Sequence, residues 1–280
     1  MERMMSEKDA IAYFTRMKWP NGFRCPRCAH SQAYRIHTRR LPLYQCRLCR
    51  HQTTVVAGTF LTKSRTPLMK WCVTLQLLSN ASGINAVQLA ERIHVTYKTA
   101  WSMLHKIRLA INAIDAQQPL TGAVRGGIFF YGSPNLQPYV RHPQEHPIFV
   151  AKGDTYNDAF PPYIKMKPVF LRHMTEKTIK PSGEAAFVNR RVHPRAVYVG
   201  LLNRVRIRQE PLLLSAFREA KQWLNRTFRG IGRKYQHLYW DEFCFRWNLS
   251  SQLLPVIPAL AEACLSRSML HYNHRLQASG

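Results

Sequence analysis

The stretch that decides the fold of the N-terminal region reads CPRC at residues 25–28 and CRLC at residues 46–49. Seventeen residues separate these two C-x2-C pairs, a spacing typical of a four-thiolate zinc site. Segments 34–36 and 43–45 are expected to pair as a hairpin that brings the pairs together. Four sulfurs close the tetrahedron, so the predicted zinc is structural; the alternative is four reduced core cysteines. The predicted ligands are Cys25, Cys28, Cys46 and Cys49.

The charge balance points to a polyanionic partner. The 280-residue chain carries 41 Lys and Arg against 15 Asp and Glu, a formal net charge of +26. Nucleic acid, either DNA or RNA, is the commonest partner for such a surplus. Anionic lipid is disfavoured because the basic residues are spread along the chain. No apolar run reaches the roughly 18 residues of a membrane span, and the paired cysteines indicate a reducing compartment, so we expect a cytoplasmic, nucleoid-associated protein without membrane contact.

Helical patterns surround the cysteine pairs and continue after them. Residues 7–18 predict a short helix that ends at WPNG, and Thr66-Pro67 predicts a cap and first-turn proline for the next helix. Asn85 with Gln88 resembles a capping box that opens a helix to residue 93. Thr96 is expected to cap a longer helix through residue 111.

The last two predicted helices have the proportions of a helix-turn-helix. Short polar and basic side chains near the start of the second helix are what a reader of the DNA major groove needs. The alternative is an ordinary helical hairpin with solvated lysines. The predicted DNA-binding residues are Lys98, Thr99, Ser102, Lys106 and Arg108.

The sequence changes to strand-like runs after about residue 122. Strands are expected at 128–131, 148–151, 169–171 and 196–199, with helices after Pro211. This order indicates a layered α/β or α+β domain. We therefore expect an α+β multidomain chain whose parts are residues 1–62, 63–118, 119–250 and 251–280.

Three stretches of the chain resemble bacterial insertion-sequence transposases of the ISXO-like group. Residues 19–59, with WPNGF, both cysteine pairs and AGT, look like the zinc ribbon of that group. Residues 95–108, VTYKTAW through LHKIR, are similar to its helix-turn-helix. KQWL at 221–224 and YWDEFCFRWN at 239–248 resemble the end of its catalytic domain.

This resemblance implies a ribonuclease-H-like α/β domain with C-terminal helices and a DDE-type metal centre. Two aspartates and a third polar group would there hold two divalent metals for in-line phosphodiester chemistry. The position of the first aspartate aligns with Gly127 and that of the second with Gly200. The third aligns with Glu219, two residues before Lys221, so the resemblance implies a degenerate triad with one carboxylate retained. Glu219 and Lys221 are the catalytic candidates that it leaves.

Three functions remain open at this level. The favoured one is a transposase-family protein that binds DNA and is defective in strand transfer. The second is an active Mg- or Mn-dependent transposase whose ligands have shifted to Asp154, Asp158 and Glu219. The third is a zinc-ribbon module for protein interaction. The sequence leaves undecided which DNA is recognised, whether a homo-oligomer forms on DNA, and whether any cleavage activity remains.

Overall fold

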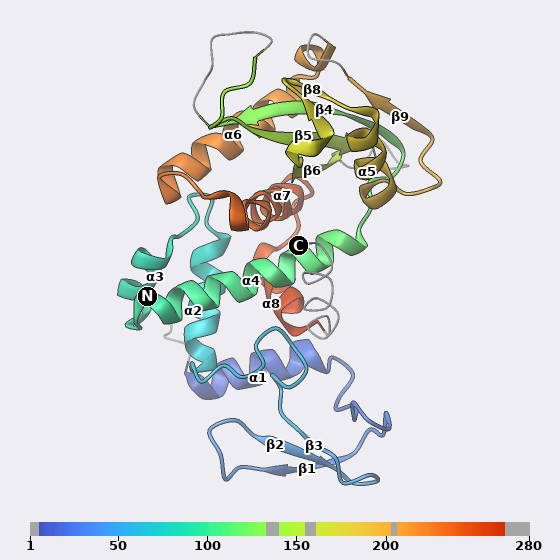
Figure 1. Ribbon diagram of the computed structural model, residues 1–280. Helices are drawn as coiled ribbons and strands as arrows, with labels where there is room; N and C mark the ends of the chain where they lie inside the picture. The colour runs from blue at the N-terminus through green and yellow to red at the C-terminus, as the bar shows by residue number, and fades with distance from the viewer. Residues whose placement is uncertain (1–5, 133–139, 155–160, 203–205, 267–280) are drawn as a thin grey trace. The chain divides into compact units, whose positions relative to one another are not determined.

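The computed structural model describes residues 6–132, 140–154, 161–202 and 206–266 (Figure 1). The chain forms two compact units, residues 1–110 with 257–280 and residues 111–256. Each unit is described by itself, and the four-part division expected from the sequence stays a prediction. None of the described helices is long and apolar enough to cross a bilayer.

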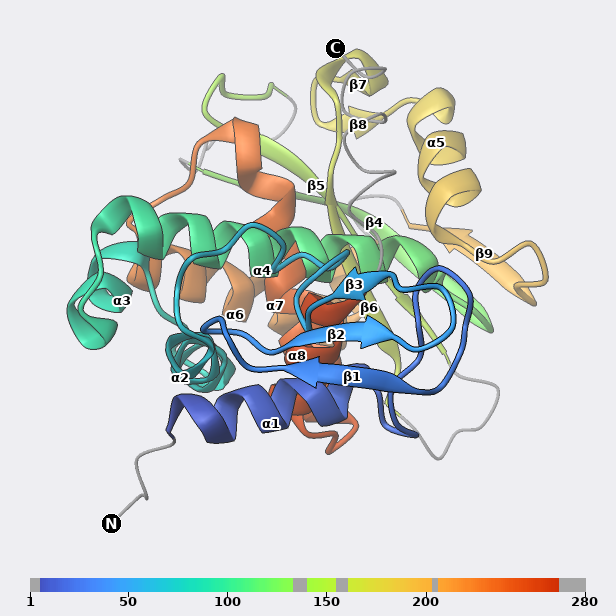
Figure 2. The same cartoon turned by 90° about the horizontal axis from the view of Figure 1, so that it is seen from below.

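The first unit joins a three-stranded ribbon to helices. The antiparallel strands β1, β2 and β3 lie in the order β1-β2-β3, and Tyr34 pairs with Gln45 as the hairpin prediction required (Figure 2). Helix α1 begins in a capping box formed by Ser6 and Asp9. The elements are α1 (Glu7–Lys18), β1 (Ala33–Ile36), β2 (Leu43–Cys46), β3 (Gln52–Thr53), α2 (Leu68–Ser79), α3 (Ala86–Ile93), α4 (Tyr97–Gln117) and α8 (Val256–Leu265).

The start of α2 differs from the expectation. Pro67 is the N-cap residue rather than the first helical residue, and it provides no side-chain cap. The carboxylate of Glu7 takes over this role, accepting hydrogen bonds from the backbone N–H groups of Leu68 at 2.9 Å and Met69 at 2.8 Å. A carboxylate at this position satisfies otherwise unpaired N–H groups and complements the positive end of the helix dipole.

Helices α3 and α4 follow each other across a tight turn. The capping box of Asn85 and Gln88 is confirmed, and α3 ends at His94, which adopts the left-handed conformation. Thr96 Oγ1 then accepts a hydrogen bond from the N–H of Thr99 at 3.2 Å. Helix α4 runs six residues beyond the expected end at 111 and contributes its last turns to the second unit.

The second unit is built on a four-stranded sheet in the order β6-β5-β4-β9. Strands β4, β5 and β6 are successively antiparallel, whereas β9 pairs parallel to β4. Strands β7 and β8 form a separate small hairpin. The elements are β4 (Ala123–Tyr131), β5 (His146–Gly153), β6 (Tyr163–Pro168), β7 (Met174–Thr175), β8 (Thr178–Ile179), α5 (Pro181–Arg191), β9 (Tyr198–Leu201), α6 (Pro211–Phe228) and α7 (Gln236–Ser251).

The strand expected at 169–171 was misplaced. The structure has β6 immediately before it, and the apolar Phe170 and Leu171 are exposed, with a 3-10 turn beginning at Leu171. Inside β6 two lysines, Lys165 and Lys167, alternate with Ile164 and Met166 and are themselves buried. Lysine is rare in buried strands, so the composition hid this strand from the sequence analysis.

The buried lysines of β6 are held by carboxylates. Lys165 Nζ lies 2.6 Å from Asp115 Oδ1, and Lys167 Nζ lies 2.5 Å from Asp115 Oδ2 and also pairs with Asp241 of α7. Arg191 adds a contact with Asp115 at 3.4 Å. Burial alone would raise the pKa of Asp115, but Lys167 and Lys165 outweigh it and lower this pKa to about 2. The network ties α4, β6 and α7 together.

Two apolar layers cover the two faces of the sheet. The side chains of Tyr131, Ile148 and Met166 pack with α6 and α7, including Phe217 and Trp240. On the other face, Val124 and Phe149 pack with α5. Figure 2 shows β4 and β5 running between α5 and the α6–α7 pair. Alternate residues of β4 therefore face α6, and the rest face α5.

Candidate metal centre and nucleic-acid interface

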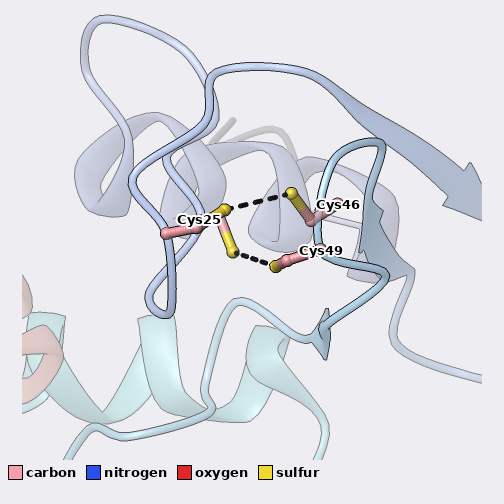
Figure 3. Close-up of side chains that lie close together, drawn as sticks. Cys25, Cys46 and Cys49 are labelled. Atoms are coloured by element: carbon pink, nitrogen blue, oxygen red, sulfur yellow. Dashed lines mark hydrogen bonds between the residues drawn. The ribbon is translucent and has the colours of Figure 1, made fainter.

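The four predicted zinc ligands converge in the ribbon. All four sulfurs lie within 4.8 Å of one another, and the labelled side chains of Cys25, Cys46 and Cys49 turn toward a common point (Figure 3). The Sγ atoms of Cys25 and Cys49 are 3.5 Å apart, and those of Cys28 and Cys46 are 3.6 Å apart. A tetrahedral zinc with Zn–S bonds of about 2.3 Å needs sulfurs separated by about 3.8 Å. The donor set fits a structural zinc ion.

The two cysteine pairs adopt the same local backbone. The N–H of Ala29 donates to the carbonyl of Cys25 at 2.9 Å, and the N–H of Arg50 donates to that of Cys46 at 3.1 Å. Ala29 and Arg50, each directly after a pair, both have φ of 59°. This left-handed conformation costs a non-glycine residue about 1 kcal/mol, so the ribbon carries a small strain at each pair.

The thiols of Cys25 and Cys28 differ in acidity before metal binds. Desolvation opposes ionisation of Cys25, but hydrogen bonds from the backbone N–H groups of Cys28 and Arg27 outweigh it and lower its pKa to about 6. A hydrogen bond from the backbone of His30 favours the Cys28 thiolate, whereas contacts with Cys49 and Cys46 raise the pKa of Cys28 to about 12. Crowded thiols therefore ionise in steps, and a divalent cation is what stabilises all four as thiolates.

Within the described residues, the cysteine cluster is the one convergent group of three or more metal-ligating side chains. His30, His37 and His51 lie nearby in sequence but do not join it. This agrees with the prediction of a closed four-sulfur site.

The predicted DNA-binding residues divide into two groups. Lys98 is exposed, and Thr99 and Ser102 are half-buried near the start of α4. Lys106 instead donates to the carbonyl of Thr62 at 2.8 Å, and burial lowers its pKa. Arg108 is only 3% exposed. Its burial removes Arg108 from the surface that a duplex can reach.

The first unit is also strongly basic along the chain. Residues 10–90 contain 12 Lys and Arg and neither Asp nor Glu. In the ribbon, the guanidinium of Arg47 lies 4.9 Å from the ring centre of Tyr34, which is half exposed. A surplus of positive charge beside exposed aromatic rings is typical of a nucleic-acid-binding surface.

The sheet places the two substituted aspartate positions on neighbouring strands. Gly200 of β9 pairs with Arg125 of β4, and Gly127 lies two residues further along β4. A Cβ atom at Gly127 would lie 2.8 Å from the carbonyl O of Leu202 and 3.0 Å from Ile207 Cδ1. A Cβ at Gly200 would meet the ring of Tyr198 at 2.6 Å. At Gly127 backbone closes the space, whereas at Gly200 only a side chain does.

Among the described residues, the other predicted carboxylates belong to no cluster of three or more metal-ligating side chains. Glu219 is exposed on α6, and Lys221 is half-buried two residues later. Asp154 follows β5, where its backbone N–H donates to the carbonyl of Ala123 at 3.2 Å. Asp158 lies outside the described residues.

Glu210 forms two ion pairs with residues of β4 and β5, which the sequence analysis did not identify. Glu210, directly before α6, places Oε1 3.2 Å from Arg125 Nη1 and Oε2 3.0 Å from Lys152 Nζ. Arg125 and Lys152 are opposite each other on β4 and β5. Burial opposes ionisation of Glu210, but Lys152 and Arg125 outweigh it and lower the pKa of Glu210. No sequence spacing signals this contact, because Glu210 comes 85 positions after Arg125.

Comparison with known proteins shows what the ribbon is similar to. Residues 5–52 match the family described as the transposase zinc-ribbon domain. A protein of Halobacterium salinarum, described as an uncharacterized protein in transposable element ISH50, is 26% identical over 132 residues. That match covers 46% of this chain and 44% of the relative, so it spans less than half of either protein. No solved structure matches. The chain is thus similar to a transposase zinc ribbon in its N-terminal residues and to a protein of a transposable element over less than half of its length.

Proposed function

We propose that the chain is a transposase-family protein that binds DNA and does not carry out strand transfer. It would act on DNA at the nucleoid, holding a duplex through the zinc ribbon and the α3–α4 pair. Support comes from the transposase ribbon at residues 5–52, the acid-free basic stretch 10–90 and the net charge of +26. The ISXO-like group is the finer assignment that we propose.

The DNA-contacting element in this proposal is a helix-turn-helix made of α3 and α4. A three-residue turn, 94–96, joins them, and the N-terminal end of α4 carries Lys98, Thr99 and Ser102. In helix-turn-helix proteins this end of the second helix enters the major groove. Lys98 would pair with phosphate or guanine, and the hydroxyl groups of Thr99 and Ser102 would contact base edges or backbone.

We propose a degenerate ribonuclease-H-like assignment for the sheet unit. Three antiparallel strands, then α5, then a fourth strand parallel to the first, form the order expected of such a domain. The observation that carries the loss of activity is the state of the two aspartate positions. Both are glycine, and backbone closes the space at Gly127. Without convergent carboxylates the site lacks the ligands needed to hold a pair of catalytic metals.

A cleavage assay tests the loss of strand transfer. The zinc-loaded chain is incubated with duplexes taken from the DNA on either side of its gene, with Mg²⁺ or Mn²⁺. We expect no nicking and no joined products with either metal. If the chain cleaves DNA with either metal, and Asp154→Ala or Glu219→Ala abolishes the cleavage, the chain is an active enzyme with shifted metal ligands.

A binding assay tests the DNA-binding half of the proposal. The affinity for a labelled duplex, measured by fluorescence anisotropy, should fall steeply with salt because phosphate contacts release counterions. Lys98→Ala should weaken binding by roughly five- to tenfold and lower the salt slope by about 1. Lys8→Ala, which removes the same charge from the exposed face of α1, is the matched control and should change little. A flat salt response would favour a protein-interaction module instead.

A further inference from the structure

The face of the sheet that carries Gly127 and Gly200 has its own set of charges. Phe129 and Tyr131 of β4 pack toward α6, so by alternation Gly127 and Arg125 lie on that face as well. Gly200 shares it, because parallel partners such as Arg125 and Gly200 point to the same side.

Two cations and one carboxylate occupy this face close to the glycines. Glu210 is 9% exposed and bridges Arg125 and Lys152, which come from the two central strands. A two-metal centre with three carboxylates leaves one net positive charge for the phosphodiester. Arg125 and Lys152 with Glu210 leave the same net charge, and here the positive charge belongs to the chain itself.

Arg125 is the member of this group that can reach a ligand. Its side chain is 49% exposed, whereas those of Lys152 and Glu210 are 17% and 11% exposed. A guanidinium offers five N–H donors in a planar fork, and the contact with Glu210 uses Nη1 at 3.2 Å. Glu210 therefore orients the guanidinium without occupying the whole of it.

We propose that Arg125, oriented by Glu210 and supported by Lys152, binds one backbone phosphate of DNA on this face without a divalent metal. This inference rests on the proposed function, because it takes DNA as the ligand of the chain. In this proposal the sheet unit contributes a phosphate contact of its own, in addition to Lys98 on α4, where a cleavage centre would otherwise lie.

Charge-matched variants on the two faces of the sheet test the proposal. Arg125→Ala should weaken duplex binding by roughly five- to tenfold and lower the salt slope by about 1. Arg190→Ala, at an exposed position of α5 on the opposite face, should leave both unchanged. The assay uses the zinc-loaded chain in buffer without Mg²⁺ and without chelator, and added Mg²⁺ should not increase affinity.

A second pair of variants changes affinity in the other direction. Glu210→Gln keeps a side-chain oxygen that can orient Arg125 but removes the negative charge that repels phosphate, so it should tighten binding by several-fold. Glu184→Gln on α5 makes the same charge change away from the site. Thermal unfolding of each variant checks that the fold is intact, and Arg125→Lys should recover part of the affinity. Equal effects of Arg125→Ala and Arg190→Ala, or of Glu210→Gln and Glu184→Gln, would overturn this inference while the parent chain still binds DNA. If the parent chain shows no salt-dependent binding, the proposed function itself fails.

Discussion

The ribbon and the sheet unit neutralise their negative groups in different ways. In the ribbon, four sulfurs converge within 4.8 Å of one another, and a bound divalent cation is what would balance four thiolates. In the sheet unit, lysine and arginine side chains supply it: Lys165 and Lys167 for Asp115, and Arg125 with Lys152 for Glu210. The stability of the first region therefore depends on an ion in solution, whereas that of the second is encoded in the chain.

Removing a zinc ligand should have the largest effect, and only on the ribbon. Cys46→Ser should abolish tight zinc binding and unfold residues 24–53, because metal binding contributes about 10 kcal/mol or more to the folding of small zinc modules. Zinc content and amide NMR spectra measure this. Cys72→Ser, outside the cluster, should keep the metal. Retention of a full zinc equivalent by Cys46→Ser would contradict the four-sulfur site.

Removing a carboxylate from the β6 network should be the next largest effect. Asp115→Asn leaves Lys165 and Lys167 buried with less compensation, which we expect to lower the free energy of unfolding by about 3 to 5 kcal/mol. Urea unfolding measures the loss, and chelators should not reproduce it. Glu184→Gln is the control, with a change within about 0.5 kcal/mol. A loss for Asp115→Asn as small as that of the control would mean that the network is not stabilising.

Acid should weaken the sheet unit through the same residue. The folded pKa of Asp115, about 2, lies below the unfolded value of about 3.9. Its contribution, roughly 2 to 3 kcal/mol, is therefore complete only above about pH 5 and is lost as the pH falls through about 4 and then 2. The gap in unfolding free energy between the parent chain and Asp115→Asn should shrink over this range. Both proteins carry the same ribbon, so acid release of zinc cancels; a constant gap would contradict the assignment.

Introducing aspartate should destabilise the sheet unit to different extents at Gly127 and at Gly200. Gly127→Asp should destabilise the sheet unit by about 1 to 2 kcal/mol, because its Cβ would meet the carbonyl of Leu202. Gly200→Asp should cost less, since the ring of Tyr198 can rotate away. Thermal unfolding measures both, and we expect the double variant to remain inactive with Mn²⁺. Cleavage by the double variant would show that the site can be rebuilt.

The smallest effect should come from relieving strain beside the cysteines. Ala29→Gly should stabilise the zinc-loaded ribbon by about 0.5 kcal/mol, because glycine adopts φ of 59° without a Cβ clash. Ala57→Gly, at a position without positive φ, should destabilise it slightly. Zinc competition with a coloured chelator can resolve the difference. Equal shifts in the two variants would indicate that Ala29 is unstrained.

Features that depend on neighbouring residues were predicted from the sequence, whereas features that depend on distant residues were missed. The ends of α1, the Asn85–Gln88 capping box and the hairpin between the cysteine pairs depend on neighbouring residues and were predicted correctly. Strand β6 was missed because its lysines find carboxylate partners on α4 and α7, which no local pattern reveals. The Arg125–Glu210 contact was missed for the same reason, since sheet register and the start of α6 create it.

The Glu7 cap on α2 has a practical consequence for producing the protein. The carboxylate of Glu7 joins two segments about sixty positions apart. Residues 10–90 contain no acid that could take its place. A shortened version that starts at the cysteine pairs would keep every sulfur and still expose the first amides of α2. Purified material trimmed in this way should fray at Leu68, because the helix that carries Glu7, α1, holds the first turn of α2 together.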